Sequence, residues 1–192
     1  MSVSDQLIQE VRAVALQQIE EYGPPHVEHF FLSEREWLKL AEMYAVDKSI
    51  VHIGVILMDI QLGYAVANWA IQDHVSMGVE YTQKLLSSYD LSPEEMTKIL
   101  ECVAKHHGAD EYICREAEIC TNADCYRFIH PRGFFLRLSV LWKRGVSIEK
   151  LFTQAEYKLE EKRNALSLDY CKQELQPYYL HFKKYLKEAR SV

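Results

Sequence analysis

Residues 49–60 read SIVHIGVILMDI, and this stretch decides the fold. Nearly every side chain in it is apolar, as expected for an element at the centre of a domain. The pattern fits a helix or a strand, and we favour a helix because the neighbouring segments have helical spacing. Asp59 ends the run, and a carboxylate there is costly to bury without a partner. The stretch therefore predicts a core helix whose charged end needs a metal ion or an Arg or Lys side chain.

The segments on both sides of this stretch also have helical patterns. Apolar residues recur at three- and four-residue steps, and Ser92, Pro93 and Glu95 form a capping-box signature at the start of one helix. The predicted helices cover about 4–21, 24–44, 49–60, 73–85, 92–107, 115–129, 134–142, 147–165 and 168–190. Asp73 and Ser147 are the expected N-caps of their helices. Residues 61–72 are expected to be irregular, and the last helix is expected to break or restart near Pro177.

Composition supports a single all-α domain over residues 1–192. Glycine and proline together make up 12 of the 192 residues, which argues against a many-turned β-sandwich. No run approaches 18 uncharged apolar residues, and the first 22 residues carry acids where a targeting peptide needs bases. We therefore expect a cytoplasmic protein that does not enter a membrane.

Charge and cysteine content exclude two further classes. The net charge is −6, which argues against a dedicated nucleic-acid-binding protein, although residues 143–192 carry 11 basic and 7 acidic side chains. The five cysteines contain no CxxC pair, so neither a disulfide framework nor a thiolate zinc site is indicated. We expect them to be reduced and mostly buried.

Histidine or aspartate occurs near several of the predicted helix ends, at His29, Asp59, His74, His106 and His107, and Asp124 lies in the middle of a predicted helix. Taken singly, most of the histidines have a simpler explanation as hydrogen-bonded core residues or helix C-terminal charges. Asp59 and Asp124 both face inward on helices that should pack together, so either a structural ion pair or a metal or substrate site explains them.

The order of these residues resembles the HD-domain superfamily of metal-dependent phosphohydrolases. Three short motifs carry the resemblance, namely Leu57-Met58-Asp59-Ile60, His74 with Gly78, and Asn122-Ala123-Asp124. The resemblance covers about residues 25–130, which implies an HD-like helical core followed by a helical extension over about 134–190. The sequence departs from the family at Met58, where the family has the histidine of its His-Asp pair.

The resemblance implies a set of metal ligands. His29, Asp59 and Asp124 would hold a first divalent ion, with His26 as a rival to His29. Asp59, His74 and either His106 or His107 would hold a second ion. Because a thioether is a poor ligand for the harder divalent metals, Met58 should weaken the first site. The metal would be Mn, Mg, Fe, Ni or Zn.

The function implied by the resemblance is hydrolysis of a phosphomonoester or phosphodiester, with a small phosphorylated molecule or nucleotide as substrate. Asp59 and His74 would act in catalysis, and Lys105 or Arg127 would hold the substrate phosphate, with Lys39 and Arg132 as further candidates. The alternatives are a catalytically inactive HD-like binding or regulatory protein, and a purely structural role for the histidines. The 22 aromatic residues and the long C-terminal helical segment would suit a homodimer.

Overall fold

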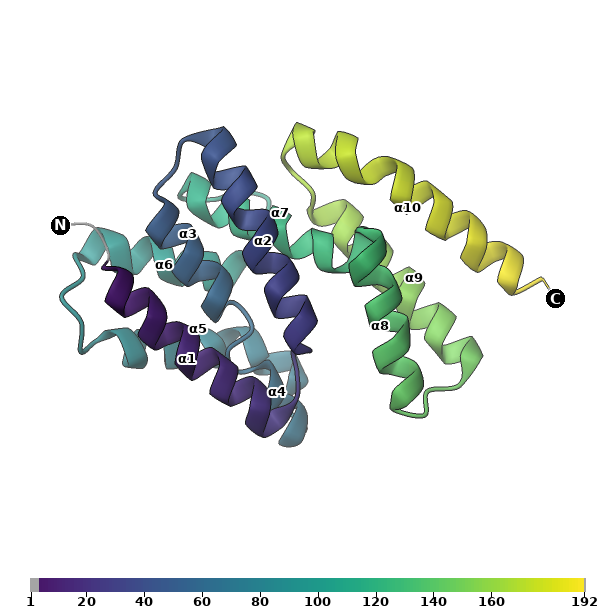
Figure 1. The fold of residues 1–192 in the computed structure, drawn as a ribbon, viewed down its shortest axis with the longest axis horizontal. Coiled ribbons are helices and arrows are strands. Elements are labelled where there is room, and N and C mark those ends of the chain that lie inside the picture. Colours follow the sequence, from purple (N-terminus) through teal and green to yellow (C-terminus); the bar gives the residue numbers. More distant parts are fainter. Residues whose placement is uncertain (1–3, 192) are drawn as a thin grey trace.

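The computed structural model describes residues 4–191, and all regular structure within them is helical. The elements are α1 (Asp5–Tyr22), α2 (Val27–Tyr44), α3 (Lys48–Leu57), α4 (Leu62–Ala67), the 3-10 turn η1 (Ile71–Asp73), α5 (His74–Leu86), α6 (Pro93–Lys105), α7 (Arg115–Ile129), α8 (Pro131–Lys143), α9 (Ile148–Ala165) and α10 (Asp169–Ala189). Figure 1 shows their arrangement. The all-α prediction is confirmed.

The segment that opened the sequence analysis forms the central helix α3. It packs against α1, α2, α6 and α7, which explains why it is apolar almost all round. Gly54 lies where α3 meets α6 and α7. A side chain at this position would collide with α6, since its Cβ would lie 2.5 Å from the Cβ of Cys102. The absence of a side chain at this position thus lets three helices approach closely.

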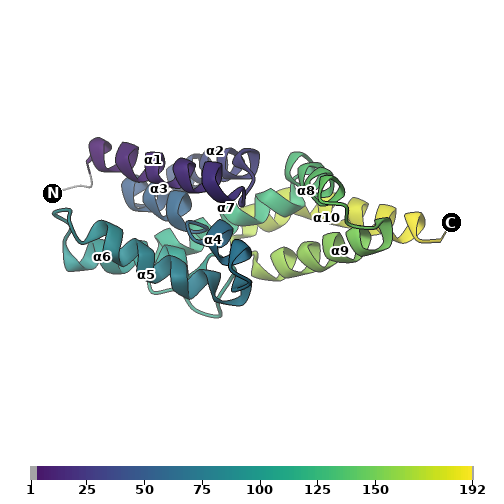
Figure 2. The same ribbon diagram turned by 90° about the horizontal axis from the view of Figure 1, so that it is seen from below.

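Helix α7 joins the two halves of the molecule. Thirteen of its residues are buried, so it has no solvent-exposed face of any length. Helices α1 to α6 lie on one side of it and α8 to α10 on the other (Figure 2). It packs against α2, α3 and α6 in the first group and against α8, α9 and α10 in the second. Side chains of α7 therefore face both groups of helices.

Most of the expected helix boundaries agree with the structure. The capping box at the start of α6 is present, with Ser92 and Glu95 exchanging both hydrogen bonds. Asp73 and Ser147 occupy N-cap positions, but neither side chain makes the capping hydrogen bond that we expected. The α2 helix begins after the two prolines, with the His26 side chain accepting from the backbone N–H of Glu28 at 3.3 Å.

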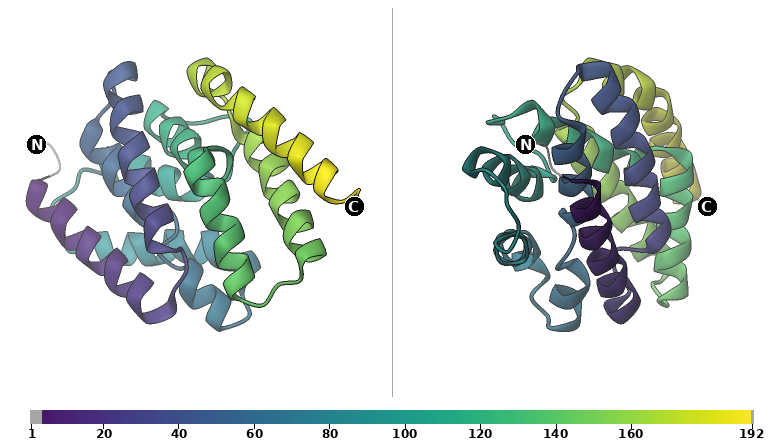
Figure 3. Two further views of the ribbon diagram at one scale, coloured as in Figure 1. Left: turned by 45° about the vertical axis from the view of Figure 1, so that its right-hand side comes forward. Right: turned by 60° about the vertical axis from the view of Figure 1, so that its left-hand side comes forward.

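Two local expectations were wrong. Residues 61–72 contain α4 and most of η1 rather than an irregular loop, because Gly63 and Ala65 are buried against neighbouring helices. Helix α10 runs through Pro177 without a break (Figure 3). The proline leaves the carbonyl of Gln173 without its usual donor, and both residues are exposed, so water can satisfy that carbonyl.

Two sequence expectations concern burial. The segment Lys48–Ala67 is long and apolar enough to cross a membrane by length and composition, with a mean hydropathy of 1.7, but 67% of it is buried inside the fold. Its apolar character therefore reflects packing in the core. Cys102, Cys120, Cys125 and Cys171 are buried and Cys114 half-buried, all as free thiols, as predicted.

Candidate metal centre

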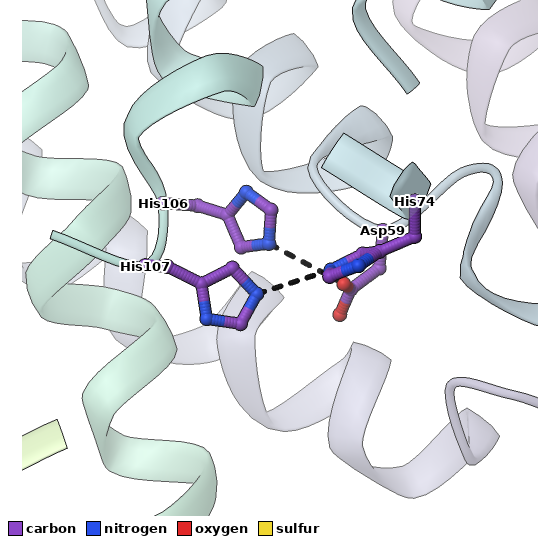
Figure 4. Close-up of side chains that lie close together, drawn as sticks. All are labelled: Asp59, His74, His106 and His107. Carbon is purple, nitrogen blue, oxygen red and sulfur yellow. Dashed lines mark hydrogen bonds and ion pairs between the residues drawn. The ribbon is translucent and has the colours of Figure 1, made fainter. Parts of the chain in front are cut away.

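Four of the predicted site residues lie together at the ends of three helices. Asp59 lies in the turn after α3, His74 begins α5, and His106 and His107 follow the last residue of α6. One potential ligand atom from each lies within 4.8 Å of all the others. Figure 4 shows the three imidazole rings and the Asp59 carboxylate directed toward a common centre.

Hydrogen bonds made by the Nδ1 atoms fix the orientation of the three rings. His74 Nδ1 donates to the Ile71 carbonyl and His106 Nδ1 to the Val103 carbonyl, both at 2.7 Å. His107 Nδ1 lies 2.9 Å from Glu161 Oε1, to which it can donate, and 3.1 Å from Lys162 Nζ, from which it can accept. In the His74 and His106 rings, a proton on Nδ1 leaves Nε2 as the nitrogen that can bind a metal ion, the arrangement found in histidines that bind metals.

The distances across the centre fit ligands of one ion. The Nε2 atoms of His74 and His107 are 3.1 Å apart, and His106 Nε2 is 3.4 Å from Asp59 Oδ1. Two nitrogens bound tetrahedrally at about 2.1 Å from zinc would be about 3.4 Å apart. His106 Nε2 is also buried without a hydrogen-bond partner among the described residues. This donor set fits a divalent cation.

Burial lowers the pKa of two of these histidines. The pKa of His107 falls to about 4 because the ring is desolvated, against the opposing effect of Glu161. Desolvation likewise lowers the pKa of His74. Both rings are therefore neutral at pH 7, which is the protonation state that metal binding requires.

Arg127 lies beside Asp59 and Lys162 beside Asp124, where the first metal ion was expected. Arg127 Nη1 donates to Asp59 Oδ2 and, at 2.8 Å, to Asp124 Oδ1. Lys162 Nζ lies 2.6 Å from the other oxygen of Asp124. All four of these side chains are buried, so their charges must compensate one another. An ion-pair network with Arg127 at its centre thus joins the two carboxylates.

The network keeps both carboxyl groups ionised. Desolvation opposes ionisation of Asp124, but Lys162 and Arg127 outweigh it and lower the pKa to about 2. At Asp59, desolvation is outweighed by Arg127 and His106, which hold the pKa well below the ordinary value. The Asp59 side chain therefore presents one oxygen to Arg127 and the other to the histidines.

Some predicted site residues lie outside the group of four. His29 is buried, and its Nε2 donates to the Gly133 carbonyl at 3.1 Å, which leaves it without a role among the grouped ligand atoms. Asp124 pairs with the two cations instead. Met58 is 3% exposed within the hydrophobic core. Lys105 is half-buried and does not line the cavity described below.

The residues proposed to hold phosphate also have other partners. Arg127 belongs to the ion-pair network. Lys39 pairs with Glu174 at 2.9 Å, and Arg132 pairs with Glu28 at 2.7 Å. Of these candidates, only Arg127 lines the cavity at the metal centre.

A cavity of about 520 Å³ opens onto the metal centre. This volume is in the range of small-molecule sites. Residues 61–72 contribute Leu62, Val66, Ile71 and Gln72 to its lining, whereas residues 108–114 contribute none. The opposite wall comes from α8 and α9, with Arg137, Val140, Arg144, Tyr157, Lys158 and Glu161.

The sequence analysis missed the site residues of α8 and α9, although a signal was present. On α9, Lys162 continues the buried stripe of Leu151, Ala155 and Leu159 at helical spacing. On α8, Arg137 falls between the buried Phe134 and Leu141 at three- and four-residue steps. A lysine or arginine on a stripe of core positions indicates a buried charge that needs a partner.

Comparison with known proteins gives one solved structure of the same fold. It is the crystal structure of a predicted HD superfamily hydrolase from an uncultured Thermotogales bacterium, with a TM-score of 0.65. The match covers 95% of this chain and 91% of that one at 14% sequence identity. No family model and no curated protein matches the sequence. The likeness establishes that this chain has the HD-domain fold, which confirms the fold that the sequence implied.

Proposed function

We propose that this protein is a phosphohydrolase of the HD type that works with a single divalent metal ion. One observation carries the proposal: three histidines with tethered Nδ1 atoms direct their Nε2 atoms toward one oxygen of Asp59, beside a cavity large enough for a small molecule. The predicted hydrolase with the same fold supports it.

The residues at the site would have separate roles in binding the metal ion and the substrate. Asp59, His74, His106 and His107 would hold the ion, and Glu161 would fix the His107 ring through Nδ1. A divalent cation bound there would lower the pKa of a bound water and offset charge on phosphoryl oxygens. Lys158, which lines the cavity and pairs with Glu161 at 2.7 Å, would add positive charge on the α9 side.

Arg127 takes the role that a first metal ion would otherwise have. Its guanidinium joins Asp59 to Asp124, as a bridging cation would, and Met58 leaves that side without the imidazole of the HD pair. We therefore expect one metal equivalent per chain rather than two. Because Arg127 occupies the place of a first metal ion, it also keeps Asp59 oriented when no metal is bound.

The test is metal content together with phosphate-ester hydrolysis. Protein purified without chelator is analysed by elemental analysis and assayed with p-nitrophenyl phosphate and bis(p-nitrophenyl) phosphate plus Mn²⁺, Mg²⁺, Ni²⁺ or Zn²⁺. The His106→Gln variant should lose the metal and the activity, whereas His181→Gln on the exposed face of α10 should keep both. Circular dichroism checks that each variant is folded.

The second candidate is a binding or regulatory protein on the same scaffold. The observation in its favour is the ion-pair network of Arg127 and Lys162, which leaves fewer carboxylate oxygens for metal than a two-metal site needs. Metal bound by the wild type but no hydrolysis of either ester would favour this candidate. Failure to bind any of the four ions would overturn the proposed metal centre itself.

A further inference from the structure

Two arginines line the cavity on the side of α8, away from the metal ligands. Arg137 lies in α8 and Arg144 is its C-cap residue, so the two are seven residues apart and share a helix face. Within residues 4–191 neither side chain forms an ion pair or a hydrogen bond, and the buried Arg137 Nε atom has no partner. The two residues therefore present unmatched positive charge to the cavity.

The position of Arg137 is unfavourable for a cation. Desolvation, Arg144 and Arg127 lower its pKa, and Glu161 is the only acid with an appreciable opposing effect. Arg137 is half-buried, and partial burial of a charge without a partner costs free energy. An anion supplied from outside the chain would remove this cost.

The other cations around Arg137 already have carboxylate partners. Arg127, Arg137, Lys158 and Lys162 all lie within 6.0 Å of the centroid of the Phe128 ring. Arg127 and Lys162 share Asp124, and Lys158 pairs with Glu161. Arg137 is the member of this group that has no carboxylate partner. Its guanidinium could therefore pair with an anionic group of a ligand bound beside Phe128.

The excess of positive charge extends over the whole cavity. Its lining includes three acids, Asp59, Asp124 and Glu161, against four bases, Arg127, Arg137, Arg144 and Lys158, with Lys162 behind Asp124. A divalent metal would increase the excess. The remaining wall is apolar, with Val66, Ile71, Val75, Phe128 and Val140. This combination suits a ligand with more than one anionic group on an organic body.

We infer that Arg137 and Arg144 form a subsite for a second phosphoryl group of the substrate, distal to the group held at the metal centre. Guanidinium groups suit this role because their planar N–H donors bind phosphate oxygens in pairs. The substrate class is thus an organic diphosphate or bisphosphate rather than a simple monoester. The inference rests on the proposed function for the first phosphoryl group, but the subsite itself needs no metal.

The subsite is tested by anion binding to metal-free protein. Isothermal titration calorimetry in the presence of chelator measures the dissociation constants of methylenediphosphonate, which resists hydrolysis, and of orthophosphate. We expect methylenediphosphonate to bind the wild type at least tenfold more tightly. Arg137→Gln and Arg144→Gln should each weaken methylenediphosphonate about tenfold or more, and they should weaken orthophosphate as well, because the metal-free protein offers both anions the same two guanidinium groups.

Two further variants separate the effect of the subsite arginines from a general loss of positive charge. Lys143→Gln removes the same charge from the exposed surface of α8 beside Arg144 and should leave both dissociation constants unchanged. Arg137→Lys keeps the charge and should restore part of the lost affinity if Arg137→Gln is folded by circular dichroism. No effect of either arginine, or methylenediphosphonate binding no more tightly than orthophosphate, would overturn the inference. Because the assay uses no metal, a failed hydrolase proposal would leave this result intact.

Discussion

At the scale of single residues, charge compensation distinguishes the two sides of Asp59. One oxygen pairs with Arg127, and the other faces the histidines. Desolvated carboxylates need such partners, and the sequence analysis had already named a metal or an Arg or Lys as the two possible partners of Asp59. The structure shows Arg127 as one partner, and the histidine group beside the other oxygen could hold a metal ion.

Arg127 should therefore matter greatly for stability. Replacing it in Arg127→Gln leaves Asp59 and Asp124 buried with too little positive charge, which we expect to cost about 3–5 kcal/mol of unfolding free energy. Arg132→Gln breaks the exposed pair with Glu28 and should cost less than about 1 kcal/mol. Urea denaturation at pH 7 measures both values, and equal losses would contradict a buried network.

At the scale of elements, the contact of α3 with α6 and α7 holds Asp59 and the two adjacent histidines in place. The ligands Asp59, His106 and His107 lie just beyond the C-terminal ends of α3 and α6, so the crossing of these helices sets their separation. Gly54 permits that crossing, since a Cβ would also lie 2.9 Å from the Sγ of Cys120. Small changes in how these helices pack should thus change the distances between the candidate ligands.

Two glycines on helices give a matched comparison. Gly54→Ala should destabilise the protein by about 1–3 kcal/mol, because the added methyl overlaps atoms of a packed core. Gly78→Ala on α5 should instead stabilise it by about 0.5–1 kcal/mol, because its Cβ would meet its nearest neighbour at an ordinary 3.5 Å and alanine favours the helix. Thermal unfolding followed by circular dichroism measures both, and a stabilising Gly54→Ala would show that the helices have room to separate.

At the scale of the whole molecule, the candidate site needs helices from both sides of α7. The candidate metal ligands come from segments of the first half, whereas Arg137, Lys158, Glu161 and Lys162 come from α8 and α9. The division into an HD-like core over 25–130 and an extension over 134–190 stays a prediction, but the site draws on both ranges. The extension supplies α8 and α9, which line the cavity beside the candidate metal centre.

Metal binding should stabilise the whole fold, because the ion would join the end of α3, the start of α5 and the end of α6. A ligand at 100 times its dissociation constant adds about 2.7 kcal/mol of stability. For a chain of this size that corresponds to an increase in Tm of roughly 5–10 °C. Differential scanning fluorimetry with added Mn²⁺ or Zn²⁺ should show this increase in the wild type and in His181→Gln. The same increase in His106→Gln would place the metal elsewhere.

The sequence by itself determined the all-α class, most helix boundaries and the set of histidines at the candidate metal centre. The class and the boundaries follow from local periodicity and capping residues, whereas the set of histidines was implied by the resemblance of their order to the HD-domain superfamily. Only the tertiary structure decided that Arg127 and Lys162 compensate Asp124, that His29 binds a backbone carbonyl, and that α8 and α9 complete the cavity. The physical reason is that these pairings depend on how helices distant in the sequence pack together. Spacing shows that Lys162 is buried, but not which carboxylate it meets.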